Sequence, residues 1–140
     1  MGQQQLLLIV LSVIIVGVSV VTGIQTFSSS AASSNQDAVI TDLTKIGSDA
    51  QGWYRKPTML GGGGNTYGAV TLTLLGYPTT PTDITGTYTT DNGTYTISAR
   101  AAGQFVIDGV GNEDGDGDGT NVTVQMTVQP NNVAVAVTNR

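Results

Sequence analysis

Residues 6–24 read LLLIVLSVIIVGVSVVTGI, nineteen positions without a charged residue or a proline. An α-helix rises about 1.5 Å per residue, so this segment is about 28 Å long as a helix, which matches the hydrocarbon core of a bilayer. Ser12, Ser19 and Thr22 do not interrupt it, because their hydroxyls can bond back to the helix backbone. The segment therefore predicts a helix that is buried in lipid or among other copies of itself.

A secretory signal peptide is the competing interpretation of this segment. Signal peptides have a basic start, a shorter apolar core and a small-residue cleavage site. Residues 1–5 contain no Lys or Arg, and the first charged side chain of the chain is Asp37. We therefore expect the segment to be retained as a membrane anchor.

The helical pattern continues beyond the apolar segment, but on one face only. After a small, polar stretch at residues 25–36, apolar residues recur at spacings of four and three, which places them on one side of a helix. We predict one helix from Gln3 to about Tyr54. Gly17, Gly23 and the serine tract lower its helix propensity, and a non-helical stretch in the filament is the alternative. Because no proline forces a break, we expect a continuous or merely bent helix. The apolar face comprises Val39, Leu43, Ile46, Ala50 and Trp53. The charged residues on the other faces are Asp37, Asp42, Lys45 and Asp49.

The rest of the chain reads as short β-strands separated by turns. Pro57 ends the helix, and four glycines follow at residues 61–64. Runs rich in Thr, Val and Tyr, which are typical of strands, occupy residues 69–75, 84–90, 94–99, 104–110, 121–128 and 133–138. Turn sequences lie at residues 91–93 and 129–132. The predicted fold class is α+β: a long N-terminal helix, residues 1–54, whose second half packs on a small antiparallel sheet in a head of residues 55–140.

The composition argues against an enzyme and against a nucleic-acid partner. Of the 140 residues 11% are charged, and none is His or Cys. These absences exclude His-based acid–base catalysis, His- or Cys-dependent nucleophilic triads, thiolate zinc sites and disulfides. A net charge of −5, with five Lys and Arg, provides little basic surface for phosphate. We expect a protein that is not an enzyme and does not bind nucleic acid.

Residues 112–119, NEDGDGDG, carry the sharpest chemical signal. Asp114, Asp116 and Asp118, followed by Gly119, match the start of a D-x-D-x-D-G calcium loop, in which oxygens at alternate positions converge. Gln occupies position 125, where an EF-hand has its closing Glu, and a strand is expected to follow the loop. We predict a Ca²⁺-ordered β-loop, and a solvated acidic turn is the alternative. The candidate ligands are Asn112, Glu113, Asp114, Asp116 and Asp118.

Two further motifs have weaker interpretations. Asn92 and Asn121 each begin an N-x-T sequon, which marks a candidate glycosylation site or a chance match. The glycines at residues 61–64 are not followed by the Lys-Ser/Thr of a phosphate-binding loop. We interpret them as a linker or a close subunit contact.

The order of a long helix, apolar and then amphipathic, followed by a small antiparallel sheet resembles the type IV pilin family. The more specific match is MGQQQLLLIVLSVIIVGVSVVTGI at residues 1–24, and a looser one is AQGWYRKPTMLGGGG at residues 50–64. The Gln-rich start is also found in archaeal pilins, which are the alternative, but the amphipathic second half of the helix favours a bacterial member. The resemblance implies cleavage of a leader, methylation of the new N-terminus and an inner-membrane anchor. It also implies a pilus assembly machinery that packs the subunit into a helical extracellular filament for adhesion or motility. The expected filament-core residues are Leu6, Leu7, Leu8, Ile9, Val10, Leu11, Val13, Ile14, Ile15, Val16, Val18, Val20, Val21 and Ile24.

The first residues depart from the family pattern. No basic leader ending in Gly is present, so Met1 is expected to be the residue that cleavage exposes and methylation modifies. Alternatively, Met1 and Gly2 are a vestigial leader and Gln3 is the first residue. With Met1 first, Gln5 stands where the family has a Glu that neutralises a neighbouring subunit's amine. Gln can accept a hydrogen bond from an ammonium group but cannot cancel its charge.

Two other functions share the same anchor. One is a pseudopilin of a type II secretion system. The other is a monomeric, membrane-anchored binding module with a calcium-ordered head. The three functions differ in whether the chain polymerises at the cell surface.

Overall fold

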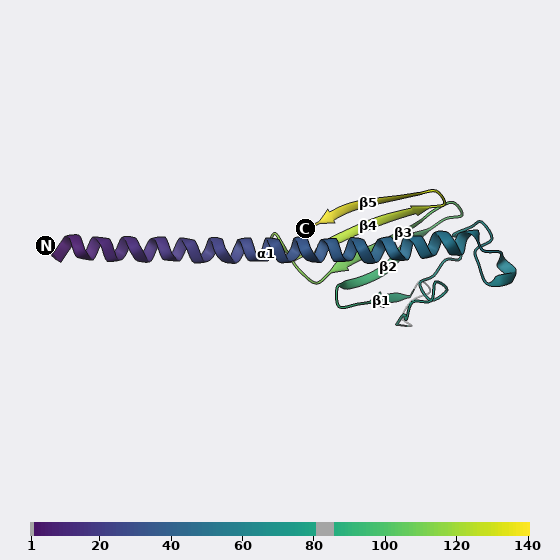
Figure 1. The fold of residues 1–140 in the computed structure, drawn as a ribbon, viewed down its shortest axis with the longest axis horizontal. Helices are drawn as coiled ribbons and strands as arrows, with labels where there is room; N and C mark the ends of the chain where they lie inside the picture. The colour runs from purple at the N-terminus through teal and green to yellow at the C-terminus, as the bar shows by residue number, and fades with distance from the viewer. Residues whose placement is uncertain (1, 81–85) are drawn as a thin grey trace.

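A single helix, α1 (Gly2–Arg55), runs along most of the molecule (Figure 1). The computed structural model describes residues 2–80 and 86–140. The helix is continuous across Gly17 and Gly23 in the single chain, and its state in a filament stays a prediction. The hydroxyls of Ser12, Ser19 and Thr22 donate to the carbonyl oxygens four residues earlier at 2.8–2.9 Å, which explains how polar residues fit within the apolar half.

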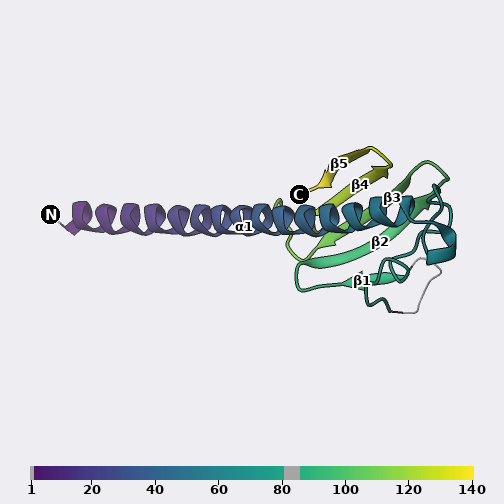
Figure 2. The same ribbon diagram turned by 45° about the vertical axis from the view of Figure 1, so that its right-hand side comes forward.

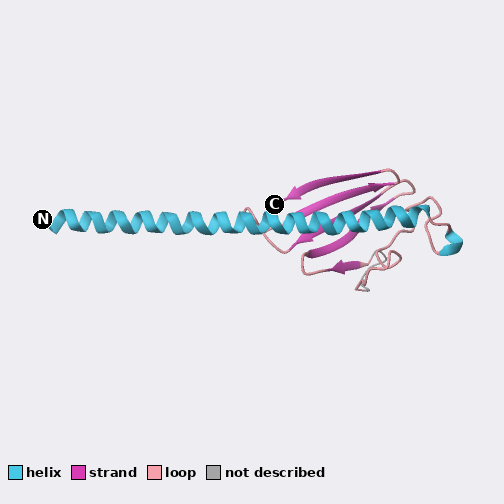
Figure 3. Cartoon of the chain, viewed as in Figure 1, coloured by secondary structure: helices cyan, strands magenta, loops and turns pink. Residues whose placement is uncertain are grey.

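The head contains one antiparallel sheet in which the strands pair in the order of the sequence (Figure 3). The strands are β1 (Thr87–Thr89), β2 (Gly93–Arg100), β3 (Phe105–Gly111), β4 (Thr123–Gln129) and β5 (Asn132–Asn139). The predicted turns join β1 to β2 and β4 to β5. Of the run predicted at residues 84–90, β1 is the part in a strand, and residues 84–85 lie outside the described residues. The α+β fold class is confirmed.

The prediction of a strand at residues 69–75 is wrong, because this segment forms turns. The amide of Val70 donates to the carbonyl of Tyr67 at 3.0 Å, and that of Leu75 donates to the carbonyl of Thr71 at 3.2 Å. Val70 and Leu72 are completely buried. Consecutive turns therefore bury the alternating apolar residues of this segment without a partner strand.

The amphipathic half of α1 crosses one face of the sheet over β3 and β4 (Figures 1 and 2). All five residues of the predicted apolar face are buried, and the most exposed of them, Trp53, is 9% exposed. They share a core with the inward side chains of the sheet. The sheet residues of this core include Tyr95, Phe105, Ile107, Val124, Met126 and Val128. The second half of the helix is thus part of the head.

The helix α1 covers one face of the sheet over β3 and β4 but does not extend over β5. Val133, Val135 and Val137 lie opposite Val128, Met126 and Val124, which are buried, so all six side chains point to the same side of the sheet. The three β5 valines are nevertheless 37–43% exposed. The strand carries no charged residue.

The four-glycine segment folds back onto the last turn of α1 and is hydrogen-bonded to it, so it is not a loose linker. The amides of Gly63 and Gly64 donate to the carbonyls of Trp53 and Lys56 at 2.8 and 3.0 Å. The Trp53 indole Nε1 donates back to the carbonyl of Gly61 at 3.1 Å. A Cβ atom at Gly63 would lie 2.5 Å from the Trp53 ring, so the close approach requires glycine. The segment therefore fixes the far tip of the head.

Candidate functional site

The first half of α1, residues 2–27, projects from the head and is exposed (Figure 1). We call this segment the rod. The large apolar side chains from Leu6 to Ile24 are 47–68% exposed, and they include all fourteen expected filament-core residues. By length and composition the helix can cross a membrane. Removing each such side chain from water is worth about 1–2 kcal/mol. This half of the helix therefore requires a surrounding of lipid or protein.

The two residues predicted at the start of the chain have no structural test. Gln5 is exposed near the beginning of α1, and Met1 lies outside the described residues. The contact of Gln5 with a neighbouring N-terminus and the processing of Met1 stay predictions.

The acidic loop, defined as residues 112–119, connects β3 to β4 and brings three carboxylates together. Oxygens of Asp114, Asp116 and Asp118 lie within 4.8 Å of one another. The Asp114 carboxylate accepts the amides of Gly117 and Gly119 at 2.8 Å each, and these bonds hold its pKa below the usual value. Both glycines have positive φ, 78° and 86°, which lets the chain fold back onto the carboxylate.

The other two predicted ligands lie outside this cluster. The Asn112 side-chain amide donates to the carbonyl of Asp91 at 2.8 Å, so it braces the neighbouring turn. The Glu113 carbonyl accepts the amide of Val122 at 2.8 Å, which closes the base of the loop. Three of the five candidate ligands are thus together and two are not. Calcium binding stays a prediction, because exposed carboxylates gather without an ion in many proteins.

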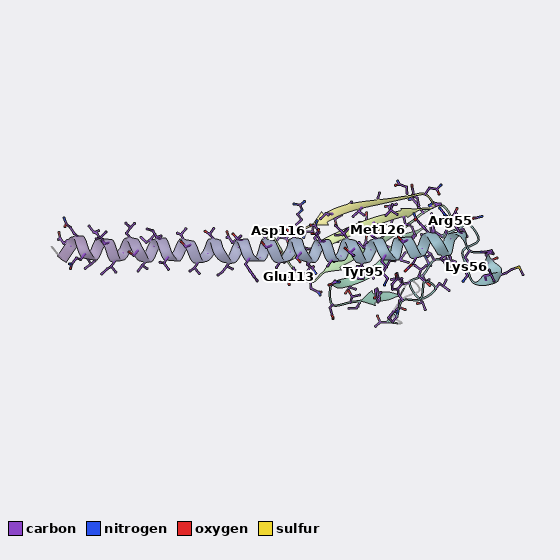
Figure 4. The ribbon with its side chains drawn as sticks, in the orientation of Figure 1. Arg55, Lys56, Tyr95, Glu113, Asp116 and Met126 are labelled. Atoms are coloured by element: carbon purple, nitrogen blue, oxygen red, sulfur yellow. The ribbon has the colours of Figure 1, made fainter. Side chains whose placement is uncertain are left out.

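The acidic loop rests on α1 where the helix leaves the head. The Ser28 hydroxyl donates to the carbonyl of Asp114 at 3.2 Å. A Cβ atom at Gly115 would lie 2.5 Å from the Cβ of Ala32, so loop and helix are in close contact. Figure 4 places Glu113 and Asp116 at this end of the head, with Arg55 and Lys56 at the opposite end. The carboxylates therefore lie next to the base of the apolar rod.

Two helix carboxylates that the sequence placed on solvent faces instead bind the head. Asp42 accepts the Tyr95 hydroxyl at 2.7 Å and the Asn92 side-chain amide at 3.0 Å. Asp49 accepts the hydroxyl of Tyr77. Burial, and then the hydrogen bond to the carboxylate, raises the pKa of both tyrosines. The separation of seven residues, two helical turns, was the available signal that the two carboxylates share one side of α1.

The side-chain nitrogens of both sequon asparagines are hydrogen-bonded. Asn92 donates to Asp42, and Asn121 donates to the carbonyl of Gly111 at 3.0 Å. Attachment of a sugar to either nitrogen would compete with these bonds in the folded chain. Glycosylation stays a prediction.

Comparison of the chain with protein-family models, curated proteins and solved structures finds no match.

Proposed function

We propose that this protein is a structural, pilin-like subunit that polymerises into a helical extracellular filament through the exposed half of α1. Before assembly the same half anchors the subunit in the inner membrane, where a pilus assembly machinery takes it up. The observation that carries the proposal is the exposure of fourteen large apolar side chains on a helix that continues into the core of the head.

The continuous helix couples assembly to the position of the head. Its second half is held by the sheet core and by the Asp42 and Asp49 bonds, so the rod and the head form one unit. When rods bundle, their apolar side chains leave water and each head takes a defined place around the bundle. Contacts between different surfaces of successive copies do not close on themselves, so they produce an open helical polymer.

The test is a charge placed inside the bundle. Val13→Asp, in cells that express only this variant, is expected to abolish filaments, because a carboxylate in a water-free bundle costs several kcal/mol per subunit, on the order of the values for unpaired buried charges. Ser48→Asp adds the same charge on an exposed face of α1 within the head and is the matched control. Filaments are measured by negative-stain microscopy of material sheared from the cell surface.

The outcomes separate the three functions. Wild-type and Ser48→Asp cells that yield filaments, with none from Val13→Asp cells, support the proposal. Wild-type cells without surface filaments contradict it and leave the pseudopilin or the anchored binding module. Abundant filaments from Val13→Asp cells contradict the apolar bundle as the cohesive element.

A further inference from the structure

Charge is separated along the axis of the head. The acidic loop contributes four carboxylates and no cation at the end next to the rod. At the other end of α1, Arg55 and Lys56 are the last two residues before Pro57, and both are exposed (Figure 4). Arg100, the last residue of β2, lies near the same end of the head. It is opposite Phe105 in the sheet, and the Phe105 ring contacts Tyr67, which in turn contacts Tyr54 in the last turns of α1. Asp49 shares a pocket with Lys56, but its carboxylate already accepts the Tyr77 hydroxyl, so each copy has an acidic end and a net basic end.

The basic end is held in a fixed shape. The amide of Gly64 donates to the carbonyl of Lys56, so the residue that follows the helix is fixed by the glycine segment. Arg55 donates to neutral oxygens, those of Pro130 and the Asn131 side chain, at 3.4 Å each. Its charge thus remains available, and the helix C-terminus favours cations at this position.

The two ends cannot neutralise each other within one chain. The acidic loop contacts α1 at Ser28, and Lys56 follows 28 residues later, which is about 42 Å of helix. Charges are screened within about 8–10 Å at physiological salt. Arg140 of the same chain lines a pocket with Asp116, but it is one cation against four carboxylates, so this end of the head stays net negative. A basic end reaches the acidic loop from another copy.

We propose that successive heads meet end to end, with Arg55 and Lys56 of one copy against the acidic loop of the next copy. This inference rests on the proposed filament, because it requires copies in the same orientation. The projecting rod is about as long as the head, since residues 2–27 span about 39 Å as helix. The copy that offers its acidic loop therefore has its apolar rod beside the head of the copy that offers Arg55 and Lys56. The loop stays net negative even with one bound divalent cation.

Cysteine cross-linking tests the contact directly, because the natural chain has no Cys. Filaments of the Lys56→Cys/Asp116→Cys variant are oxidised and run on a non-reducing gel. A disulfide needs Cα atoms within about 7 Å, so an intramolecular bond across the head is impossible. End-to-end contact predicts a ladder of trimers and higher species. The matched control, Lys45→Cys/Asp116→Cys, moves one cysteine to an exposed position midway along the head's part of the helix and is expected to give no ladder.

Charge exchange gives a second, independent readout. Lys56→Glu and Asp116→Lys are each expected to lower filament yield roughly tenfold, and their combination to restore it, because like charges then become opposite ones. Lys45→Glu makes the same change in net charge away from the contact and should assemble as wild type. Melting of the detergent-extracted subunits confirms that each variant folds.

Each result decides one question. Filaments of the Lys56→Cys/Asp116→Cys variant that give no ladder above the control, or single charge reversals that assemble normally, overturn the end-to-end contact and leave the filament itself standing. Absence of wild-type filaments overturns the proposed function. A ladder together with rescue by the paired reversal supports both.

Discussion

Asp42 is expected to be the main polar attachment of α1 to the β1–β2 hairpin. Its carboxylate receives the Tyr95 hydroxyl at 2.7 Å and the Asn92 amide at 3.0 Å. Asp42→Ala removes both bonds, together with the longer one from the Thr90 hydroxyl at 3.4 Å, and takes the carboxylate partner away from the fully buried Tyr95. The helix should then be held on this flank by apolar packing and by the bond that the Asn35 side-chain amide donates to the carbonyl of Asn92 at 2.8 Å.

The magnitude follows from the two bonds. Hydrogen bonds to a charged group contribute about 1.5–3 kcal/mol each, and the two bonds here lie at or below the lower value because Asp42 is half-buried. We therefore expect Asp42→Ala to lower the free energy of unfolding by about 2–3 kcal/mol. At about 4 °C per kcal/mol for a domain of this size, the melting temperature falls by about 8–12 °C. Tyr95→Phe removes one bond and should cost about half as much.

The assay is thermal unfolding of the full chain in detergent micelles, followed by circular dichroism of the head. Asp37→Ala, an exposed acid on the same helix, is the control and should change stability by less than about 0.5 kcal/mol. The double variant Asp42→Ala/Tyr95→Phe should lose less than the sum of the single variants, because both remove the same bond. Additive losses, or an Asp42→Ala melting temperature equal to that of Asp37→Ala, would refute this account.

Two further predictions concern pH and calcium. The raised pKa of Tyr95 means that its stabilisation is complete below its unfolded-state pKa of about 10 and is lost as pH rises above that value, so the melting temperature should fall on the alkaline side. Tyr95→Phe should reduce this fall but not abolish it, because the pKa of Tyr77 is raised as well. An unchanged alkaline profile in that variant would contradict the assignment. Excess Ca²⁺ should raise the melting temperature of the full chain in micelles relative to chelator, because a ligand that binds the native state stabilises it by mass action. Asp116→Asn should reduce that difference. Equal melting temperatures of the wild-type chain in Ca²⁺ and in chelator would contradict calcium binding and support the alternative, a solvated acidic turn.

Periodic burial was the part of the fold that the sequence made predictable. The spacing of Val39, Leu43 and Ile46 is a property of the helix alone, so it predicted the buried face correctly. The same reasoning failed at residues 69–75, since Val70 and Leu72 can be buried by consecutive turns as well as by a strand. Alternation describes which side chains are buried but does not specify the hydrogen-bond partner of the backbone.

Contacts between distant residues limited the prediction of the site. The convergence of Asp114, Asp116 and Asp118 is local and was predicted from their spacing. The engagement of Asn112 with Asp91 depends on where two loops meet in space, so the sequence did not indicate it. The charge separation of the head has the same origin, because Lys56 and Asp116 are placed at opposite ends by the docking of α1 on the sheet.

The bare edge at β5 has a consequence for the head when it is not held in place by its rod. As the last strand of the sheet, β5 has unpaired backbone groups along one side, and it contains alternating valines without a charged residue or a proline. The register of its pairing with β4 shifts only near one end, between Thr123 and Val124. Natural sheets usually protect such edges against pairing with other chains. A rod embedded in lipid or in a bundle would restrict how two heads can approach. Soluble heads cut free of the rod lose that restriction, and strand-to-strand adhesion then becomes their most accessible mode of aggregation.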